Sequence, residues 1–231
     1  MRFRSDFHVF RRLADGAGAR LPMAWADRYP CLTDATAETG FDRHYILHPA
    51  WAARVLARLA PPFHVDISSS LHFCTLVSAF VPVRFFDYRP ARMTLPGLSS
   101  AHADLTRLPF ADGELPSLSC MHVVEHVGLG RYGDAVDADG DLKAIAELKR
   151  VVRPGGSLLF VVPVGRPRIQ FNAHRIYGYD QVVGCFDGFR LMEYALIPDR
   201  PEDGDLIVGA TAEQTAAQSF GCGCFWFVRE G

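Results

Sequence analysis

The sequence has no apolar run long enough to cross a bilayer as a helix, because the longest one, residues 157–164, has the length of a strand. The N-terminal segment MRFRSDFHVF is charged throughout, so it predicts no secretory signal. Cations are not in excess: 24 Lys and Arg residues stand against 26 Asp and Glu residues, and the formal net charge is −2. Sequence-independent nucleic-acid binding requires a cationic surface, so the composition argues against a nucleic-acid partner.

Cysteine is scarce as well, with six residues in a chain of 231. A chain of this length can bury a sufficient core without disulfides, and six cysteines are too few for a small disulfide-stapled secreted domain. We therefore expect a cytoplasmic protein with reduced thiols. The composition, 49% hydrophobic and 22% charged, is that of a soluble globular domain and excludes disordered, collagenous and coiled-coil chains.

Beyond about residue 63, short runs rich in Val, Ile, Leu and Phe alternate with longer helical patterns. Continuous apolar strands separated by helices are typical of a parallel sheet covered on both faces. The sequence therefore predicts an α/β domain with a doubly wound, mostly parallel sheet, whose ligand lies beyond the carboxyl ends of the strands. The seven expected strands are residues 63–67, 81–87, 98–103, 118–124, 157–163, 189–197 and 222–228.

One helix of this domain is well marked, at residues 141–152. Its apolar stripe consists of Leu142, Ile145, Leu148 and Val152. Basic residues crowd its C-terminal end, where the helix dipole favours cations. The segment Pro154-Gly155-Gly156 then ends the helix and leads into the next strand.

Residues 1–62 have a different pattern. One expected helical face carries Phe3, Phe7 and Phe10. A second helix is expected over residues 48–60, where two prolines follow. We expect a helical N-terminal cap over residues 1–62 and the α/β domain over residues 63–231. The phenylalanine face suits docking onto the protein's own core, and a protein partner or a membrane surface is the alternative.

The first half of the α/β domain carries a nucleotide-binding pattern. A strand at residues 64–67 leads into Ser68, Ser69 and Ser70, a helix follows, and the next strand ends at Asp87. Asp87 follows Ser68 by 19 residues, close to the spacing at which an acid meets the ribose hydroxyls of a bound adenosine. The turn holds three serines where glycines are expected, so this pattern alone is weakly specific.

The second half of the domain is more specific. It contains Asp104 ahead of a Leu-Pro-Phe segment, the turn Asp112-Gly113, a strand followed by Glu125-His126, and Pro-Gly-Gly before the next strand. With these features the chain resembles the class I S-adenosylmethionine-dependent methyltransferases over about residues 63–228. Three further segments resemble an uncharacterised branch of that superfamily, whose members look like enzymes of surface-glycan or small-molecule pathways: residues 128–134, 171–175 and 222–227.

The resemblance implies that S-adenosylmethionine is the cofactor. The residues that it assigns to the cofactor are Asp66, Ser68, Ser69, Asp87, Asp104, Leu105 and His122. Asp66 would lie at the loop that meets the methionine end, Asp87 would bind the ribose hydroxyls, and Asp104 would contact the adenine. His122 would line the floor near the methyl group. The departure from the family pattern is the glycine-free first loop, where serine hydroxyls would replace lost backbone donors.

The acceptor side is expected above the strand ends. Methyl transfer needs an in-line approach and often a base, and His126 and His174 suit that task because imidazole titrates near neutrality. Glu125 is the third catalytic candidate. Acceptor contacts are expected from Arg131, Tyr132, Arg175, His44 and Tyr45.

The predicted function is therefore O-methylation of a saccharide or a small-molecule hydroxyl. Two alternatives remain open. One is a protein of methyltransferase fold without cofactor binding that serves as a binding or scaffold subunit. The other is a transferase that uses a nucleotide-sugar in the same crevice.

Three metal-like patterns lead to no metal prediction. His122-Val-Val-Glu125-His126 matches a helical zinc motif, but in a strand its two histidines would lie too far apart for one zinc. The acidic segment 134–141 lacks the glycine and the closing glutamate of a calcium loop. Cys222-x-Cys224 has no second cysteine pair in the sequence and is expected in the last strand.

Overall fold

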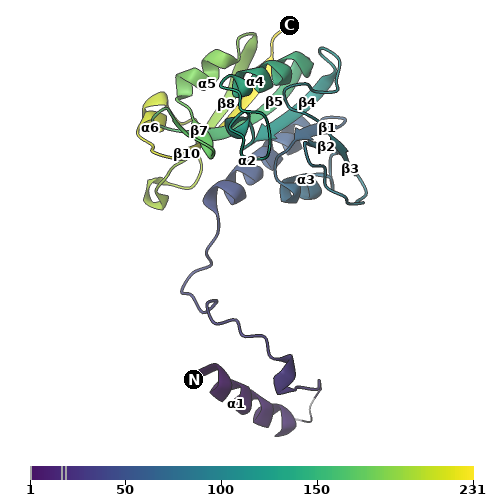
Figure 1. Ribbon diagram of the computed structural model, residues 1–231, viewed down its shortest axis with the longest axis vertical. Coiled ribbons are helices and arrows are strands. Elements are labelled where there is room, and N and C mark those ends of the chain that lie inside the picture. Colours follow the sequence, from purple (N-terminus) through teal and green to yellow (C-terminus); the bar gives the residue numbers. More distant parts are fainter. Residues whose placement is uncertain (1, 17, 19) are drawn as a thin grey trace. The chain divides into compact units, whose positions relative to one another are not determined.

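The computed structural model of the protein describes residues 2–16, 18 and 20–231. The chain forms two compact units, Met1–Phe41 and Asp42–Gly231 (Figure 1). The division thus lies at residues 41/42 and not at the expected 62/63. The reason is helix α2 (Arg43–Leu59), because its residues Trp51, Val55 and Leu56 are buried in a core that they share with the sheet of the second unit.

The first unit is small. Its helix α1 (Arg2–Gly16) packs Phe7 against Trp25, with 4.8 Å between the ring centroids, and the Arg28 guanidinium lies 4.7 Å from the same indole ring. Within α1, as far as the structure describes it, no residue is buried, and Phe10 and Leu13 are exposed. None of the described helices has both the length and the apolarity to span a bilayer. A protein or membrane-surface partner for the phenylalanine face stays a prediction.

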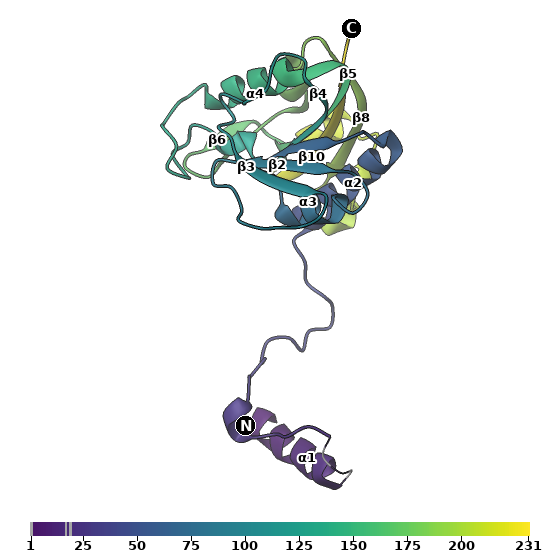
Figure 2. The same cartoon turned by 90° about the vertical axis from the view of Figure 1, so that its right-hand side faces the viewer.

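The second unit is built on an eight-stranded sheet of order β3-β2-β1-β4-β5-β10-β8-β9. Its strands are β1 (His64–Ile67), β2 (Val83–Asp87), β3 (Leu98–His102), β4 (Leu115–Met121), β5 (Val152–Val164), β8 (Phe189–Ile197), β9 (Ile207–Val208) and β10 (Gly221–Arg229). Strands β1 to β5 pair in parallel, whereas β10 runs antiparallel between β5 and β8. The predicted doubly wound, mostly parallel α/β fold is confirmed (Figure 2).

All seven expected strands have counterparts, but two strand pairings are missing from the sequence prediction. Strand β9 extends the sheet antiparallel to β8, and β6 (Arg168–Gln170) pairs with β7 (His174–Ile176) in a separate antiparallel sheet. With two or three residues each, these strands are too short to show an alternating pattern. The strand expected at residues 118–124 ends at Met121, because the backbone turns at His122, whose φ is +57°.

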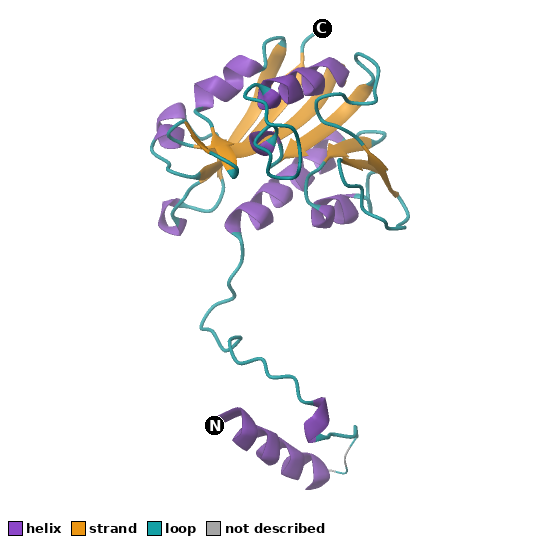
Figure 3. Cartoon of the chain, in the orientation of Figure 1, coloured by secondary structure: helices purple, strands orange, loops and turns teal. Residues whose placement is uncertain are grey.

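Helices cover both faces of the sheet (Figure 3). Helices α4 (Gly140–Val151) and α5 (Tyr179–Cys185) share one buried apolar cluster with Leu158 and Phe160 of β5. Helices α2 and α3 (Leu71–Val77) share a second cluster with Leu159 and Val161 of the same strand. Successive side chains of a strand point to opposite faces, so β5 supplies both cores, as a doubly wound sheet requires.

Helix α2 begins earlier than the expected residue 48. The Asp42 side chain accepts a hydrogen bond from the backbone N–H of Tyr45 (3.1 Å) and so caps a helix that starts at Arg43. Pro49 therefore lies inside the helix and not at its first turn. The longer helix places His44 and Tyr45 beside the residues that follow β4.

Candidate functional site

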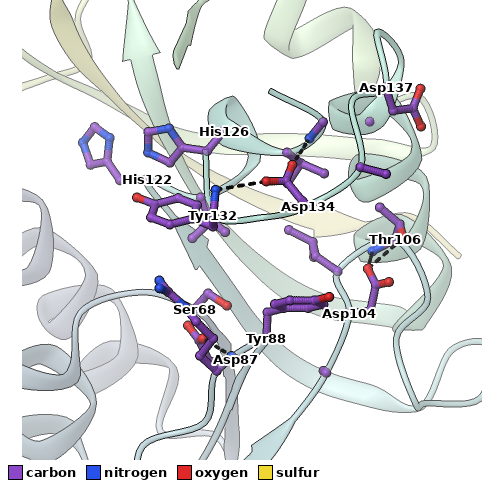
Figure 4. Close-up of a pocket in the computed structure, with 18 residues that line it drawn as sticks. Ser68, Asp87, Tyr88, Asp104, Thr106, His122, His126, Tyr132, Asp134 and Asp137 are labelled. Carbon is purple, nitrogen blue, oxygen red and sulfur yellow. Dashed lines mark hydrogen bonds between the residues drawn. The ribbon is translucent and has the colours of Figure 1, made fainter. Parts of the chain in front are cut away.

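A cavity of about 430 Å³ lies where the carboxyl ends of β1, β2, β3 and β4 meet (Figure 4). This is the place at which open parallel sheets bind their ligands. The residues that line it are Ser68, Asp87, Tyr88, Arg89, Ala103, Asp104, Leu105, Thr106, His122, Val123, His126, Val127, Gly128, Tyr132, Asp134, Ala135, Asp137 and Gly140.

The glycine-free loop adopts a glycine-like backbone at its first serine. Ser68 follows β1 with φ +56°, and its N–H donates to the Phe86 carbonyl (2.7 Å). The left-handed conformation costs a residue with a Cβ about 1 kcal/mol. Ser69 turns its hydroxyl away from the cavity lining, where the oxygen accepts a hydrogen bond from the Met121 N–H (3.0 Å). The loop is thereby tied to the ends of both neighbouring strands.

Asp66 supports this loop from beneath and lies outside the cavity lining. Its fully buried carboxylate accepts hydrogen bonds from the Ser69 N–H (3.0 Å) and from the Ser119 hydroxyl. The Ser119 oxygen also lies 2.8 Å from Nε2 of His64, whose Nδ1 lies 2.8 Å from the Ser117 oxygen. Burial raises the pKa of Asp66 to about 6 and lowers the pKa of His64 to about 3. Asp66, which the sequence predicts at the loop for the methionine end of the cofactor, thus belongs to a buried chain of hydrogen bonds beneath that loop.

The carboxylates of Asp87 and Asp104 lie in the cavity lining, at the end of β2 and after β3. Asp87, the last residue of β2, accepts a hydrogen bond from the Arg89 N–H (2.6 Å). One Asp104 oxygen accepts from both the backbone N–H (2.8 Å) and the hydroxyl (2.7 Å) of Thr106. These bonds orient both side chains in the cavity lining, which also contains the buried, apolar Leu105.

His122 forms the floor between the cavity and helix α2. Its Nδ1–H donates to Oε1 of Glu125 (2.9 Å), and Glu125 itself is buried outside the cavity lining. The rings of His44 and Tyr45 stack on the His122 ring at 5.6 and 5.4 Å. Burial and the neighbouring His122 lower the pKa of His44 to about 4, and burial with the Glu125 charge raises that of Tyr45 to about 12. His44 and Tyr45 lie outside the cavity lining and contact His122, which belongs to it.

His126 has the geometry of a base. It follows β4 at the end of a short 3₁₀ helix, Val124–His126, so the interpretation of this segment as a continuing strand is wrong. Its Nδ1 lies 2.6 Å from the Ala173 carbonyl oxygen, which fixes the proton on Nδ1 and leaves the lone pair on Nε2, 3.8 Å from Oε1 of Glu125. His174, 6.3 Å away between ring centroids, lies outside the lining, and its Nε2 is 2.5 Å from the Gln170 side-chain oxygen.

The two expected acceptor arginines are used differently. Arg131 donates to the Ala173 carbonyl (3.2 Å), packs over the ring of Tyr132 and lies outside the lining. Arg175 is buried, where it donates to the Val127 carbonyl (2.7 Å) and lies 3.4 Å from Asp141. Arg175 therefore holds the loop between β4 and α4 in place through hydrogen bonds to its carbonyl groups. Among the residues expected to contact the acceptor, Tyr132 lines the cavity.

The loop between β4 and α4 contributes residues to the cavity lining that the sequence prediction did not include among the site residues. Asp134 accepts hydrogen bonds from the N–H groups of Gly128 (2.8 Å) and Tyr132 (3.1 Å). Partial burial opposes ionisation of Asp134, but these backbone donors outweigh it and lower its pKa. Thr106 and Arg89 line the cavity too. The only available signal was the glycine-rich segment 128–134, which marks a tight loop without revealing what it faces.

Gly128→Ala is expected to destabilise the second unit by about 2–4 kcal/mol. Gly128 has φ +79°, and a Cβ there would lie 2.1 Å from the Asp137 carbonyl oxygen, so overpacking is added to the cost of a left-handed backbone. Gly133 has φ +84° with nothing within 4 Å, so Gly133→Ala carries only the backbone cost of about 1 kcal/mol. Urea unfolding of both variants gives the comparison, and equal losses would contradict the close approach at Gly128.

Comparisons with known proteins agree with this architecture. Residues 114–203 match a family described as Caenorhabditis protein of unknown function, DUF268. No curated protein matches the sequence significantly.

Solved structures match over most of the chain at low sequence identity. The 1,6-didemethyltoxoflavin-N1-methyltransferase of Burkholderia thailandensis, solved with S-adenosylhomocysteine, is 10% identical with a TM-score of 0.57, covering 80% of this chain and 79% of that one. The N-methyltransferase NodS of Bradyrhizobium japonicum, also in complex with S-adenosylhomocysteine, is 15% identical with a TM-score of 0.51, covering 80% and 89%.

A third match is the [4+2]-cyclase SpnF, 13% identical with a TM-score of 0.50, covering 78% of this chain and 81% of that one. Its name describes a cyclisation, so the shared architecture alone does not fix the reaction. The strand order, the antiparallel β10 and these matches agree on one conclusion. The unit Asp42–Gly231 has the fold of the class I S-adenosylmethionine-dependent methyltransferases.

Proposed function

We propose that the protein is an S-adenosylmethionine-dependent methyltransferase that acts on a hydroxyl group of a saccharide or another small molecule. The observation that carries the proposal is the cavity itself. It lies at the strand ends of a methyltransferase fold, with Asp87 and Asp104 on its wall and His126 at its edge. When bound, S-adenosylmethionine would supply an electrophilic methyl group on a sulfonium.

The lining suits the parts of this cofactor. A volume of about 430 Å³ is in the range of small-molecule sites. Asp87 offers a carboxylate for two ribose hydroxyls, and Leu105 offers an apolar surface for the adenine beside Asp104. The hydroxyl of Ser69 is engaged with the Met121 N–H, and Ser68 keeps the left-handed turn that a glycine would have, so neither observation conflicts with a bound cofactor.

His126 is the residue we assign to proton transfer. An acceptor hydroxyl loses its proton as its oxygen attacks the methyl group, and the Nε2 lone pair of His126 can take that proton. Tyr132 packs edge-on to the His126 ring, with 5.7 Å between centroids, and limits the directions from which an acceptor can approach. Arg89, which also lines the cavity, would favour an acceptor that carries a negative charge.

Calorimetric titration with S-adenosylhomocysteine tests the cofactor assignment. The wild-type protein is expected to bind it, and Asp87→Ala is expected to weaken binding by about 10- to 100-fold, since it removes hydrogen bonds to a charged acceptor. Asp180→Ala, an exposed acid in α5 outside the cavity lining, is the matched control and should bind as the wild type does. Absence of binding heat with the wild-type protein at millimolar ligand would overturn the proposal.

The Ser68–Ser70 loop favours a second candidate, in which the same crevice holds a different nucleotide. The Arg89 guanidinium, 4.9 Å from the Tyr132 ring centroid, would suit the diphosphate of a nucleotide-sugar. A thermal-shift panel with S-adenosylmethionine and nucleotide-sugars separates the two. Stabilisation by a nucleotide-sugar alone would favour the second candidate, and stabilisation by neither would favour a binding or scaffold subunit.

A further inference from the structure

A second cluster of potential ligands lies behind His122. It joins His44 of α2, His122 after β4 and Cys222 of β10. One ligand atom from each of these residues lies within 4.8 Å of the other two. Imidazole nitrogen and thiolate sulfur at such separations can converge on a single Zn²⁺ with small side-chain movements. All three residues belong to the unit Asp42–Gly231.

The hydrogen bonds around the cluster prepare the nitrogen of His122 for a metal. Its Nδ1–H donates to the buried Glu125 carboxylate (2.9 Å), so Nε2 carries the lone pair. Among the described residues that nitrogen has no hydrogen-bond partner, although the His122 side chain is only 5% exposed. A carboxylate that orients a histidine from behind is the usual arrangement at zinc sites, where it fixes the tautomer and raises the basicity of the ligand.

His48 repeats the pattern one helical turn after His44. Its Nδ1 lies 2.6 Å from the His44 carbonyl oxygen, and its buried Nε2 finds no partner in the part of the chain that the structure describes. Its ring lies 5.0 Å from the His122 ring. Native proteins pair nearly all their buried polar atoms, so unpartnered nitrogens on two neighbouring imidazole rings indicate that a further group belongs here.

The third ligand supplies the soft donor. Cys222 is fully buried and carries a free thiol. The sulfur of Cys224, on the same strand, lies 3.9 Å from the sulfur of Cys222 and is not part of the cluster. One thiolate with two imidazoles is a donor set that selects Zn²⁺ over Mg²⁺ or Ca²⁺, which prefer oxygen ligands.

We propose that His44, His122 and Cys222 form a Zn²⁺ site. Binding forms two Zn–N bonds and one Zn–S bond, the Cys222 thiol releases its proton to solvent, and nothing is oxidised or reduced. Three protein ligands leave the fourth tetrahedral position open. The site does not use His126, so it differs from the zinc motif that the segment His122–His126 resembles in sequence.

The metal would connect α2, β10 and the segment after β4. His122 is the shared element, since its ring both belongs to the cluster and lines the cavity. Zn²⁺ would therefore fix the cavity floor and hold His122 in its left-handed backbone conformation. This inference stands on the cluster alone and does not depend on the methyltransferase activity.

The test uses the full-length protein, stripped with a chelator and then titrated with Zn²⁺ or Co²⁺. We expect one metal ion per chain and, with Co²⁺, the absorption band of a thiolate-to-cobalt charge transfer. Cys222→Ser should abolish that band and weaken Zn²⁺ binding by about 100-fold or more, beyond the 10- to 100-fold typical of the residues that support metal ligands. Glu125→Gln should fall within that smaller range.

Cys224→Ser is the matched control, because it makes the same change in an equally buried thiol on the same strand and should leave stoichiometry and spectrum unchanged. Should Cys222→Ser fail to fold, release of one proton per Zn²⁺ and the cobalt spectrum of the wild-type protein still test the thiolate ligand. A wild-type protein that takes up much less than one equivalent, or equal effects of the two cysteine variants, would overturn the proposal.

Discussion

Asp66→Asn is expected to steepen the acid destabilisation of the protein by about 1.4 kcal/mol per pH unit between pH 6 and pH 4. The cause is the buried chain that links Asp66 to His64 through Ser119. In the folded protein burial raises the pKa of Asp66 from 3.8 to about 6, so the folded chain holds a proton that the unfolded chain has released. The contribution of Asp66 to stability is therefore full below pH 3.8 and is lost as the pH rises through 6.

Between pH 4 and pH 6, His64 changes the free energy of unfolding with pH in the direction opposite to Asp66. Burial lowers its pKa from 6.5 to about 3, so between these values the unfolded chain binds a proton that the folded chain rejects. Its contribution is present above pH 6.5 and is lost as the pH falls towards 3. In the wild-type protein, the pH dependences of the free energy of unfolding due to Asp66 and His64 cancel between about pH 4 and pH 6. When the Asp66 carboxylate is removed, only the pH dependence due to His64 remains.

His64→Gln is expected to change the pH dependence of stability in the opposite direction to Asp66→Asn. The variant no longer loses stability through protonation of His64 in the unfolded chain. Its free energy of unfolding should therefore rise relative to the wild type by about 1.4 kcal/mol per pH unit as the pH falls from 6.5. Urea unfolding at half-unit steps from pH 4 to pH 7 measures both variants. Slopes are compared, so a constant loss of stability in either variant cancels. Parallel curves for the three proteins would contradict the assigned protonation states.

His126→Ala is expected to lower the methyl-transfer turnover number by about 100-fold or more, in the range typical of a lost general base. The Nδ1–H bond to Ala173 holds its Nε2 lone pair ready, and its ring lines the cavity. His174→Ala should change turnover by less than about 3-fold, because His174 lies outside the lining and its Nε2 bonds to Gln170. The two variants therefore separate the two histidines that the sequence offers as bases.

The measurement is the production of S-adenosylhomocysteine against a panel of saccharides and small hydroxyl compounds, once one of them supports turnover. The affinity for S-adenosylhomocysteine, measured alongside, shows whether His126→Ala acts on chemistry or on cofactor binding. Loss of the acidic limb of the pH–rate profile in His126→Ala would mark the base directly. Wild-type turnover in both variants would exclude both histidines as the base.

The central strands could be predicted from the sequence because they are buried on both faces. A run such as Leu158–Val162 leaves no other environment for its side chains. The start of α2 could not be predicted, because it depends on one cap, Asp42, and the sequence offers Pro49 as a more conventional beginning. The presence of Asp87 and Asp104 at the carboxyl ends of the strands could be predicted from their spacing along the chain and from the family resemblance.

The orientation of the remaining site residues depends on contacts that spacing does not encode. Arg131 lies in the loop after β4 and packs on an aromatic ring, whereas Arg175 lies in strand β7 and is buried under carbonyl groups. Asp66 is drawn inward by Ser119, on a strand 53 residues away. The cluster of His44, His122 and Cys222 forms only when three segments that are distant in the sequence fold together, so no local motif predicts it.

The position of β10 has a consequence for biosynthesis. This strand fills the gap between β5 and β8, yet the ribosome makes it after both of them. A nascent chain that has emerged only as far as β8 has two long apolar strand edges with no neighbour to pair with, and such edges invite association with other chains. The sheet can therefore be completed only at the end of synthesis. Before β10 is made, binding of a holdase chaperone would protect the unpaired edges of β5 and β8 from association with other chains.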